Sequence, residues 1–196
     1  MGGLVLAVVI AYLLGSVPVG LLIGQIWGRD LRQYGSGNIG TTNALRVLGA
    51  KAAVLTLIGD AAKGILGGYL GLLLNGTQLG MVLGALAAIF GQTYPLFLGF
   101  KGGKGVATSF GAVLFLSPAM GGVLLAIWLV VVFLTRYVSL SSMTAAACAP
   151  LMVYLLKLPP VYYLFAFVAG GHIIYRHKEN IKRLLAGKEY KFGERV

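Results

Sequence analysis

Six long apolar stretches constrain the fold of this chain more than any other feature of its sequence. A helix crosses the hydrocarbon core of a bilayer with about 20 residues, so most of these stretches can form one membrane-spanning helix each. Only 11% of the residues are charged, whereas a soluble domain carries about 25%. We therefore expect an all-α fold, a polytopic membrane helical bundle. The stretches cover residues 3–27, 51–74, 79–98, 105–134, 139–156 and 160–175.

The fourth stretch, 105–134, is too long for one ordinary span, and it contains Ser117 followed by Pro118. Because the residue before a proline avoids helical geometry, we expect a short helix over 105–116 and a full helix over 119–135. The bundle then has about seven transmembrane segments, including short or broken ones. All 196 residues are expected to form this single membrane domain.

The positions of the basic residues predict the orientation of the bundle. Lys and Arg collect on cytoplasmic loops of membrane proteins. With seven segments and the N-terminus outside, nearly all basic residues and the C-terminus fall on the inner side; the exceptions are Lys157, outside, and Lys63, within a helix. The net charge of +11 therefore indicates membrane orientation and not nucleic-acid binding.

Three short clusters, rich in glycine and in basic or amide residues, interrupt the apolar pattern. They cover residues 35–43 followed by Arg46, 100–108 and 177–183, and all three fall on the expected inner side. Glycine lets backbone N–H groups approach a ligand closely, and Lys, Arg and helix N-termini attract negative charge. Because such groups are costly in hydrocarbon, the clusters predict one pocket for phosphorylated substrates.

The first cluster precedes an expected helix over 41–48, which Thr41 or Thr42 could cap. The free N–H groups of that helix would point at one anion site. Its glycines formally match the dinucleotide fingerprint, which requires a preceding strand; here a membrane helix precedes it, so we reject that reading. A simple interfacial turn is the alternative.

The second cluster, Lys101 to Gly105, is similar to a phosphate-binding loop. Gly105 replaces the Ser or Thr that would hold Mg²⁺ in a nucleotide-hydrolysing loop, and position 98 is Leu. Lys104 can still hold a phosphate as a point charge. Anchoring at the membrane surface is the alternative.

In the third cluster, His177 and Asn180 share a face if the segment is helical. Position 182 is Lys, so the His-x-x-x-x-Asp dyad of the soluble-type glycerolipid acyltransferases is absent. Asp60 and Lys63 are one turn apart inside a span and are expected to form a buried pair. With Asp and Glu totalling 5, no catalytic metal and no cofactor are expected.

Together the clusters resemble the three motifs of the bacterial membrane acyltransferases that use acyl phosphate to acylate glycerol 3-phosphate. The matching sequences are GSGNIGTTNALRVLG, YPLFLGFKGGKGVATSFG and HKENIKRLLAGKE. The shorter pieces YLLGSVP, DAAKG and RYVSLSS also resemble that family. One departure is Gln92, at a position where many members have His.

The resemblance implies transfer of a fatty acyl group from acyl phosphate to the 1-hydroxyl of sn-glycerol 3-phosphate, giving lysophosphatidate and phosphate. This is the first step of phospholipid synthesis, at the plasma membrane and facing the cytoplasm. For the proton acceptor, both His177 and a substrate phosphate oxygen stay open, and we favour the substrate.

The matched motifs also imply roles for individual residues. The acyl-phosphate headgroup is assigned to Ser36, Gly37, Asn38, Gly40, Thr41, Thr42, Asn43 and Lys104. Glycerol 3-phosphate is assigned to Arg46, Lys104, Ser142, His177 and Asn180. Lys104, Ser142, His177 and Asn180 are the expected catalytic residues.

A small membrane anion or phosphate transporter is the alternative function, since it would also need basic loops and broken helices. Carriers commonly contain repeated halves, and no internal repeat is evident in this chain. An alcohol phosphotransferase would need several intramembrane aspartates, and Asp60 is the only one.

Overall fold

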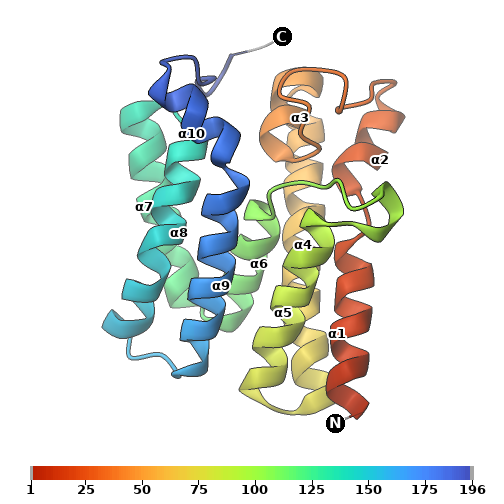
Figure 1. Cartoon of the computed structure of the whole chain (residues 1–196), viewed down its shortest axis with the longest axis vertical. Helices are drawn as coiled ribbons and strands as arrows, with labels where there is room; N and C mark the ends of the chain where they lie inside the picture. The colour runs from red at the N-terminus through yellow and green to blue at the C-terminus, as the bar shows by residue number, and fades with distance from the viewer. Residues whose placement is uncertain (1, 195–196) are drawn as a thin grey trace. The chain divides into compact units, whose positions relative to one another are not determined.

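The structure, a computed structural model, describes residues 2–194, and that part of the chain consists of helices and connecting loops with no β-strand (Figure 1). This confirms the expected all-α class. In chain order the helices are α1 (Gly2–Gly15), α2 (Val19–Ile26), α3 (Thr41–Leu48), α4 (Ala50–Asn75), α5 (Gln78–Thr93), the 3₁₀ turn η1 (Leu96–Leu98), α6 (Val106–Leu116), α7 (Pro118–Thr135), α8 (Val138–Leu155), α9 (Val161–Arg176) and α10 (Lys178–Leu185).

The described chain divides into two compact units, residues 2–116 and 117–194. The boundary is the Ser117–Pro118 step at which the sequence predicts a break between two helices. Ser117 is the N-cap of α7, and its side chain accepts a hydrogen bond from the Met120 N–H. The extended backbone of Ser117 is the geometry that a following proline imposes.

In the first unit, α4 is the central helix and packs against α1, α3, α5 and α6. Small residues allow this close packing, as is usual for helices in membranes. A Cβ added to Gly64 would collide with the carbonyl oxygen of Thr108 on α6, and one added to Gly71 with that of Gly80 on α5. The backbone of α4 is therefore in direct contact with the backbones of α5 and α6.

In the second unit, α8 packs between α7 and α9, and α10 follows α9 after His177 alone. The C-terminal segment folds back onto the turn between α7 and α8. There the Phe192 N–H donates to the carbonyl oxygen of Arg136 at 2.7 Å, and Arg136 Nη2 donates to the carbonyl oxygen of Phe192 at 3.1 Å.

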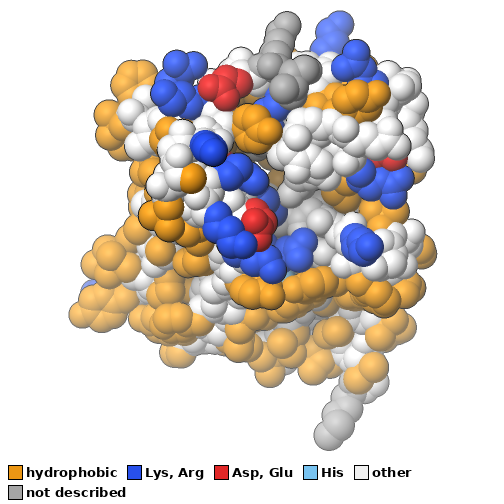
Figure 2. All heavy atoms as spheres, turned by 45° about the horizontal axis from the view of Figure 1, so that its top comes forward, with side chains coloured by type: hydrophobic (Ala, Val, Ile, Leu, Met, Phe, Trp, Pro, Cys, Tyr) orange, Lys and Arg blue, Asp and Glu red, His pale blue; other side chains and the backbone are white. Residues whose placement is uncertain are grey.

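Within residues 2–194, five helical segments are long and apolar enough to cross a membrane. The other two expected segments are shorter: α6 has 11 residues and α9 has 16. Apolar side chains point outward, as Phe133 at 85% exposure illustrates. Figure 2 shows many Lys and Arg side chains, in blue, gathered on the face turned toward the viewer, with orange apolar side chains beside and below them. The five candidate spans cover residues 2–26, 50–75, 78–98, 118–135 and 138–155.

The first apolar stretch differs from the expectation of one uninterrupted helix over 3–27. The helix ends at Gly15 and a second one begins at Val19. Proline has no backbone N–H and interrupts the helical hydrogen-bond ladder, and Pro18 occupies the N-cap position of α2. The break separates α1, with 14 residues, from α2, with 8 residues, and α2 leads into the first glycine-rich cluster.

Candidate functional site

The first cluster is organised by Asn43, near the start of α3. Its side chain is 2% exposed, and its Oδ1 accepts from the Ser36 N–H at 2.9 Å and from Arg46 Nη1 at 3.5 Å. Its Nδ2 donates to the carbonyl oxygens of Leu31 at 3.0 Å and Tyr34 at 3.1 Å. These four bonds use the full hydrogen-bonding capacity of the amide. Asn43 therefore holds the loop over residues 31–36 against α3.

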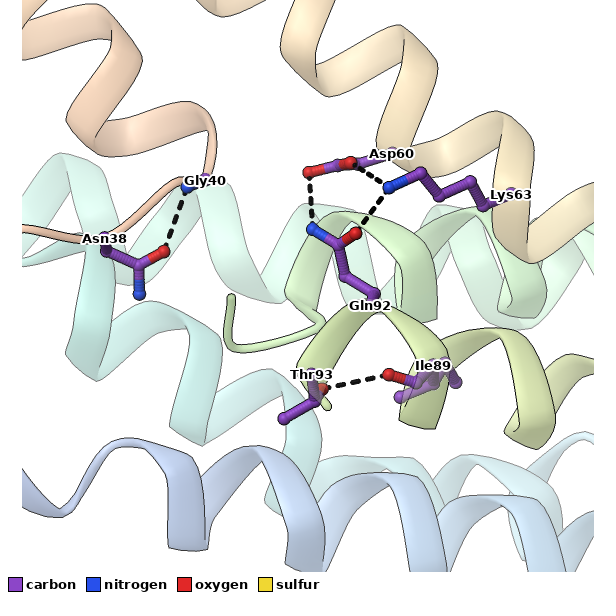
Figure 3. Close-up of polar contacts among 7 residues, drawn as sticks. All are labelled: Asn38, Gly40, Asp60, Lys63, Ile89, Gln92 and Thr93. Atoms are coloured by element: carbon purple, nitrogen blue, oxygen red, sulfur yellow. Dashed lines mark hydrogen bonds and ion pairs between the residues drawn. The ribbon is translucent and has the colours of Figure 1, made fainter. Parts of the chain in front are cut away.

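The rest of this loop prepares the N-terminus of α3. Asn38 Oδ1 accepts from the Gly40 N–H at 2.9 Å (Figure 3), and Gly37 has a φ of 69°, in the left-handed region that favours glycine. The expected helix over 41–48 is confirmed, but the expected Thr cap is wrong. Gly40 is the N-cap and makes no side-chain cap bond. The Thr41 Oγ1 is buried, and the described residues offer it no hydrogen-bond partner.

The second cluster folds back onto the C-terminal end of α5. The N–H groups of Gly102 and Gly103 donate to the carbonyl oxygens of Thr93 and Gln92, both at 3.1 Å. The carbonyl groups in the last turn of a helix have no hydrogen-bond partner within the helix, and these two N–H groups provide donors for two of them. Lys104, the next residue, is half-buried and lies two residues before α6.

The first two clusters meet within this unit. A Cβ added to Gly103 would lie 3.7 Å from Asn38 Oδ1 and 3.9 Å from Ile39 Cγ1. The loop that precedes α3 and the loop that precedes α6 therefore lie side by side. This places Lys104 on the same loop pair as the glycines and hydroxyls of the first cluster.

Directly against the second cluster, three buried side chains form a closed ring (Figure 3). Lys63 Nζ donates to Asp60 Oδ1 at 2.9 Å and to Gln92 Oε1 at 2.5 Å. Gln92 Nε2 donates to Asp60 Oδ2 at 3.0 Å. The expected pair of Asp60 and Lys63 is confirmed. The sequence analysis missed its third partner, because Gln92 lies 29 residues beyond Lys63 on another helix.

In the second unit, Ser142 lies in the first turns of α8 and is 5% exposed. Its Oγ donates to the carbonyl oxygen of Val138 at 2.9 Å and accepts from Trp128 Nε1 at 3.2 Å. Trp128 is a neighbour that the sequence analysis did not foresee. It belongs to α7 and holds the hydroxyl of Ser142 in one orientation.

His177 and Asn180 are both buried, at 2% and 5% exposure. His177 connects α9 to α10, and its Nδ1 lies 2.7 Å from the carbonyl oxygen of Ile173. Since a carbonyl can only accept, Nδ1 carries a proton and donates it to this bond. Asn180 Nδ2 donates to Glu189 Oε1 at 2.6 Å.

Glu189 is the main residue that the sequence analysis overlooked. Its carboxylate accepts hydrogen bonds from Ser139 Oγ at 2.8 Å, from Asn180 Nδ2 at 2.6 Å and from Arg183 Nε at 2.7 Å. Burial raises the pKa of Glu189, but the bonds from Asn180, Arg183 and Ser139 and the charge of Arg183 outweigh it. The net pKa lies below the usual glutamate value. An ionised carboxylate therefore orders the third cluster.

The structure distributes the expected site residues over both units. Ser36 to Arg46 and Lys104 belong to the first unit, while Ser142, His177 and Asn180 belong to the second. Among residues 2–194, no three His, Cys, Asp or Glu side chains are grouped so that they could hold a metal ion. The polar groups available are amides, hydroxyls, one imidazole and basic side chains, a set suited to binding anions.

Comparison with known proteins reveals relatives over nearly the full length of the chain. The family model described as "Glycerol-3-phosphate acyltransferase" matches residues 5–187. The glycerol-3-phosphate acyltransferase of Rubrobacter xylanophilus is 44% identical over 97% of this chain and 96% of its own length. Glycerol-3-phosphate acyltransferase 2 of Moorella thermoacetica is 48% identical over 97% of this chain and 98% of its own length.

Two solved structures are also similar to this chain. Both are crystal structures of PlsY, described as an integral membrane glycerol 3-phosphate acyltransferase. The glycerol 3-phosphate form matches with a TM-score of 0.91 and 41% identity, covering 97% of this chain and 96% of that one. The lysophosphatidic acid form matches with a TM-score of 0.89 and 40% identity, covering 97% and 95%.

Proposed function

The chain belongs to the glycerol-3-phosphate acyltransferase family, and from this premise we propose the reaction that it catalyses. It transfers a fatty acyl group from acyl phosphate to the 1-hydroxyl of sn-glycerol 3-phosphate and releases lysophosphatidate and inorganic phosphate. The observation that carries the proposal is the match, at 41% identity over 97% of the chain, to a membrane acyltransferase crystallised in a glycerol 3-phosphate form.

The acyl-phosphate headgroup is assigned to the first glycine-rich loop and Lys104. Ser36, Gly37, Asn38, Gly40, Thr41 and Thr42 supply amides and hydroxyls, and Lys104 supplies positive charge. The buried Thr41 hydroxyl, to which the described residues offer no partner, supports a ligand at this loop. Asn43, whose amide is fully engaged, contributes by holding the loop in shape.

Glycerol 3-phosphate is assigned to Arg46, Lys104, Ser142, His177 and Asn180. Arg46 and Lys104 suit the phosphate, because guanidinium and ammonium groups bind phosphate oxygens as donors. The remaining three are buried polar side chains suited to the glycerol hydroxyls. The orientations of all three are fixed by bonds within the second unit.

The reaction needs little covalent catalysis by the protein. The 1-hydroxyl oxygen attacks the carbonyl carbon of the mixed anhydride, the bond from that carbon to the phosphate oxygen breaks, and phosphate leaves with its electron pair. The hydroxyl proton passes to a phosphate oxygen of the substrate, with His177 Nε2 as the second candidate. Holding the two substrates together supplies much of the rate by proximity, and basic donors stabilise the departing phosphate.

The protein is a multi-pass membrane protein, and we place it in the plasma membrane with the reaction on the cytoplasmic side. The basis is the distribution of Lys and Arg along the sequence, which follows the positive-inside rule. The N-terminus then lies outside and the C-terminus inside. The acyl chain of the donor enters from the surrounding lipid, so both the donor and the product remain in the bilayer.

Purified protein supplied with palmitoyl phosphate and radiolabelled glycerol 3-phosphate tests the proposed reaction. The expected product is labelled lysophosphatidate in equal amount to released phosphate, with no product when palmitoyl-CoA replaces the donor. Lys104→Ala is expected to reduce kcat/KM by at least about a hundredfold. Phosphate uptake into vesicles without lysophosphatidate formation would instead support a transporter.

His177→Gln separates the two candidate proton acceptors. If a substrate phosphate oxygen takes the proton, the variant retains measurable kcat, and the main loss is in KM for glycerol 3-phosphate. If His177 is the base, turnover disappears at saturating substrate while binding of glycerol 3-phosphate persists.

A further inference from the structure

The ring of Asp60, Lys63 and Gln92 is not used by the proposed chemistry, although it is the most deeply buried charged group in the first unit. The three side chains are 2%, 3% and 4% exposed. An ion pair in such a site gains little stability over apolar residues of similar size. What the ring does provide is direction, because the Lys63 ammonium can only donate: Gln92 must turn Oε1 toward it, so that Nε2 faces Asp60 Oδ2. The Gln92 amide therefore has one permitted orientation (Figure 3).

Gln92 also contacts the second cluster in two ways. It is the penultimate residue of α5, and its carbonyl oxygen accepts the Gly103 N–H at 3.1 Å. Its side chain is equally close, since a Cβ added to Gly103 would lie 3.2 Å from Gln92 Nε2. Helix ends fray unless their terminal groups are held. The ring connects the last turn of α5 to α4. The N–H groups of Gly102 and Gly103 then hydrogen-bond to that last turn.

We propose that Gln92, oriented by Asp60 and Lys63, is a positioning residue for Lys104. The ring fixes the end of α5, the end of α5 fixes Gly102 and Gly103, and these two residues fix the backbone from which the Lys104 side chain extends. The inference rests on the role of Lys104 in the proposed function. It adds three residues that act on the substrates through the loop and do not touch them.

Gln92→Leu removes the donor and the acceptor while keeping a side chain of similar volume and the Asp60–Lys63 pair. Gln92→His is the conservative variant, because a neutral imidazole has one N–H donor and one acceptor nitrogen and can bridge both partners again. Thr56→Val is the matched control. Thr56 is also buried on α4, at 0% exposure, and its hydroxyl donates within its own helix to the carbonyl oxygen of Ala52 at 2.8 Å.

The measurements are hydrogen–deuterium exchange of the peptide over 101–105 and kcat/KM for palmitoyl phosphate, both on the purified full-length protein. Gln92→Leu is expected to make the Gly102 and Gly103 amides exchange about tenfold faster and to lower kcat/KM about tenfold. Gln92→His restores both values to within about threefold of the parent protein. Thr56→Val lowers the melting temperature but changes neither readout.

A folded Gln92→Leu protein with unchanged exchange over 101–105 would overturn the proposal, as would an equal change in Thr56→Val. If Gln92→Leu does not fold, Gln92→Asn takes its place, since a side chain one methylene shorter cannot reach both partners. Lys104→Ala tests the underlying assignment separately. Full activity of Lys104→Ala would overturn the role of Lys104, whereas the exchange experiment tests the positioning by Gln92 alone.

Discussion

Gly102 lies so close to the end of α5 that no side chain fits there. A Cβ at this position would collide with the carbonyl oxygen of Gln92 and the ring of Pro95. Gly102→Ala must therefore displace the loop that carries Lys104. We expect kcat/KM to fall by about a hundredfold, because displacing a catalytic group by about 1 Å can cause a loss of that size. Steady-state assays measure it.

Gly122→Ala is the control for this substitution. Gly122 lies inside α7, and apart from the adjacent backbone of that helix no described atom lies within 4 Å of an added Cβ. Alanine is the better helix former, so this variant keeps its activity and its stability. Equal activity losses in Gly102→Ala and Gly122→Ala would contradict the steric argument.

The Glu189 carboxylate makes stability depend on pH in the acid range. Its pKa is lower in the folded protein than in the unfolded chain, so its contribution is complete above the unfolded value, for which the reference is 4.5. It disappears as the pH falls through the folded value. Glu189→Gln is therefore expected to lower the melting temperature at pH 7, with a loss of about 2 kcal/mol in the free energy of unfolding, and the difference from the parent protein shrinks as the pH falls below 4.5.

Thermal unfolding of Glu179→Gln provides the comparison for this carboxylate. Glu179 is on the same helix as Asn180, but its side chain is 58% exposed and pairs with the exposed Lys182. Such surface pairs contribute little. A pH-independent difference between Glu189→Gln and the parent protein would contradict the electrostatic explanation.

At the scale of helices, the contact between α7 and α8 offers a test of how Ser142 is oriented. Trp128→Phe removes the indole N–H that donates to Ser142 Oγ but keeps most of the aromatic surface. The loss of one hydrogen bond is worth about 1 kcal/mol. We expect KM for glycerol 3-phosphate to rise about fivefold, with kcat nearly unchanged. Trp27→Phe, at a tryptophan with 41% exposure, should leave KM unchanged.

The boundaries of most helices were predictable because apolar runs and proline positions set them locally. The helix over 41–48 and the break at Ser117–Pro118 agree with the sequence analysis. The break at Pro18 was missed because the residues on both sides of it are apolar, so hydropathy alone did not reveal it. The partners of Gln92 and Ser142 could not be predicted, because each depends on which helices pack together. The partner of Asn180 could not be predicted, because it lies in the segment that follows α10.

At the scale of the whole molecule, the expected orientation can be tested by labelling single cysteines. In a Cys148→Ala background, Lys157→Cys and Lys188→Cys each place a thiol at an exposed position. By the positive-inside rule, a membrane-impermeant maleimide applied to intact cells should label only Lys157→Cys. Lys188→Cys should react after permeabilisation. Labelling of Lys188→Cys in intact cells would show that the topology is the opposite of the expected one.

The placement of the polar clusters along the chain could be read from the sequence, since glycine, amide and basic residues are rare in membrane spans. The role of each residue within a cluster could not be read from the sequence. The sequence analysis assigned Asn43 to substrate binding but did not predict that its amide holds a loop. Glu189 was not singled out, because a carboxylate beyond the end of α10 acquires its role only when the tail folds back to Ser139.

The fastening of the C-terminal segment has a practical consequence for anyone who handles this protein. Glu189 ties the segment to α8 and α10, and Phe192 ties it to Arg136. A truncation that removes all residues after Ala186 would eliminate both attachments and the carboxylate partner of Asn180. Affinity tags and fluorescent fusions should therefore be attached after Glu194, so that the hydrogen bonds of Glu189 and Phe192 are kept.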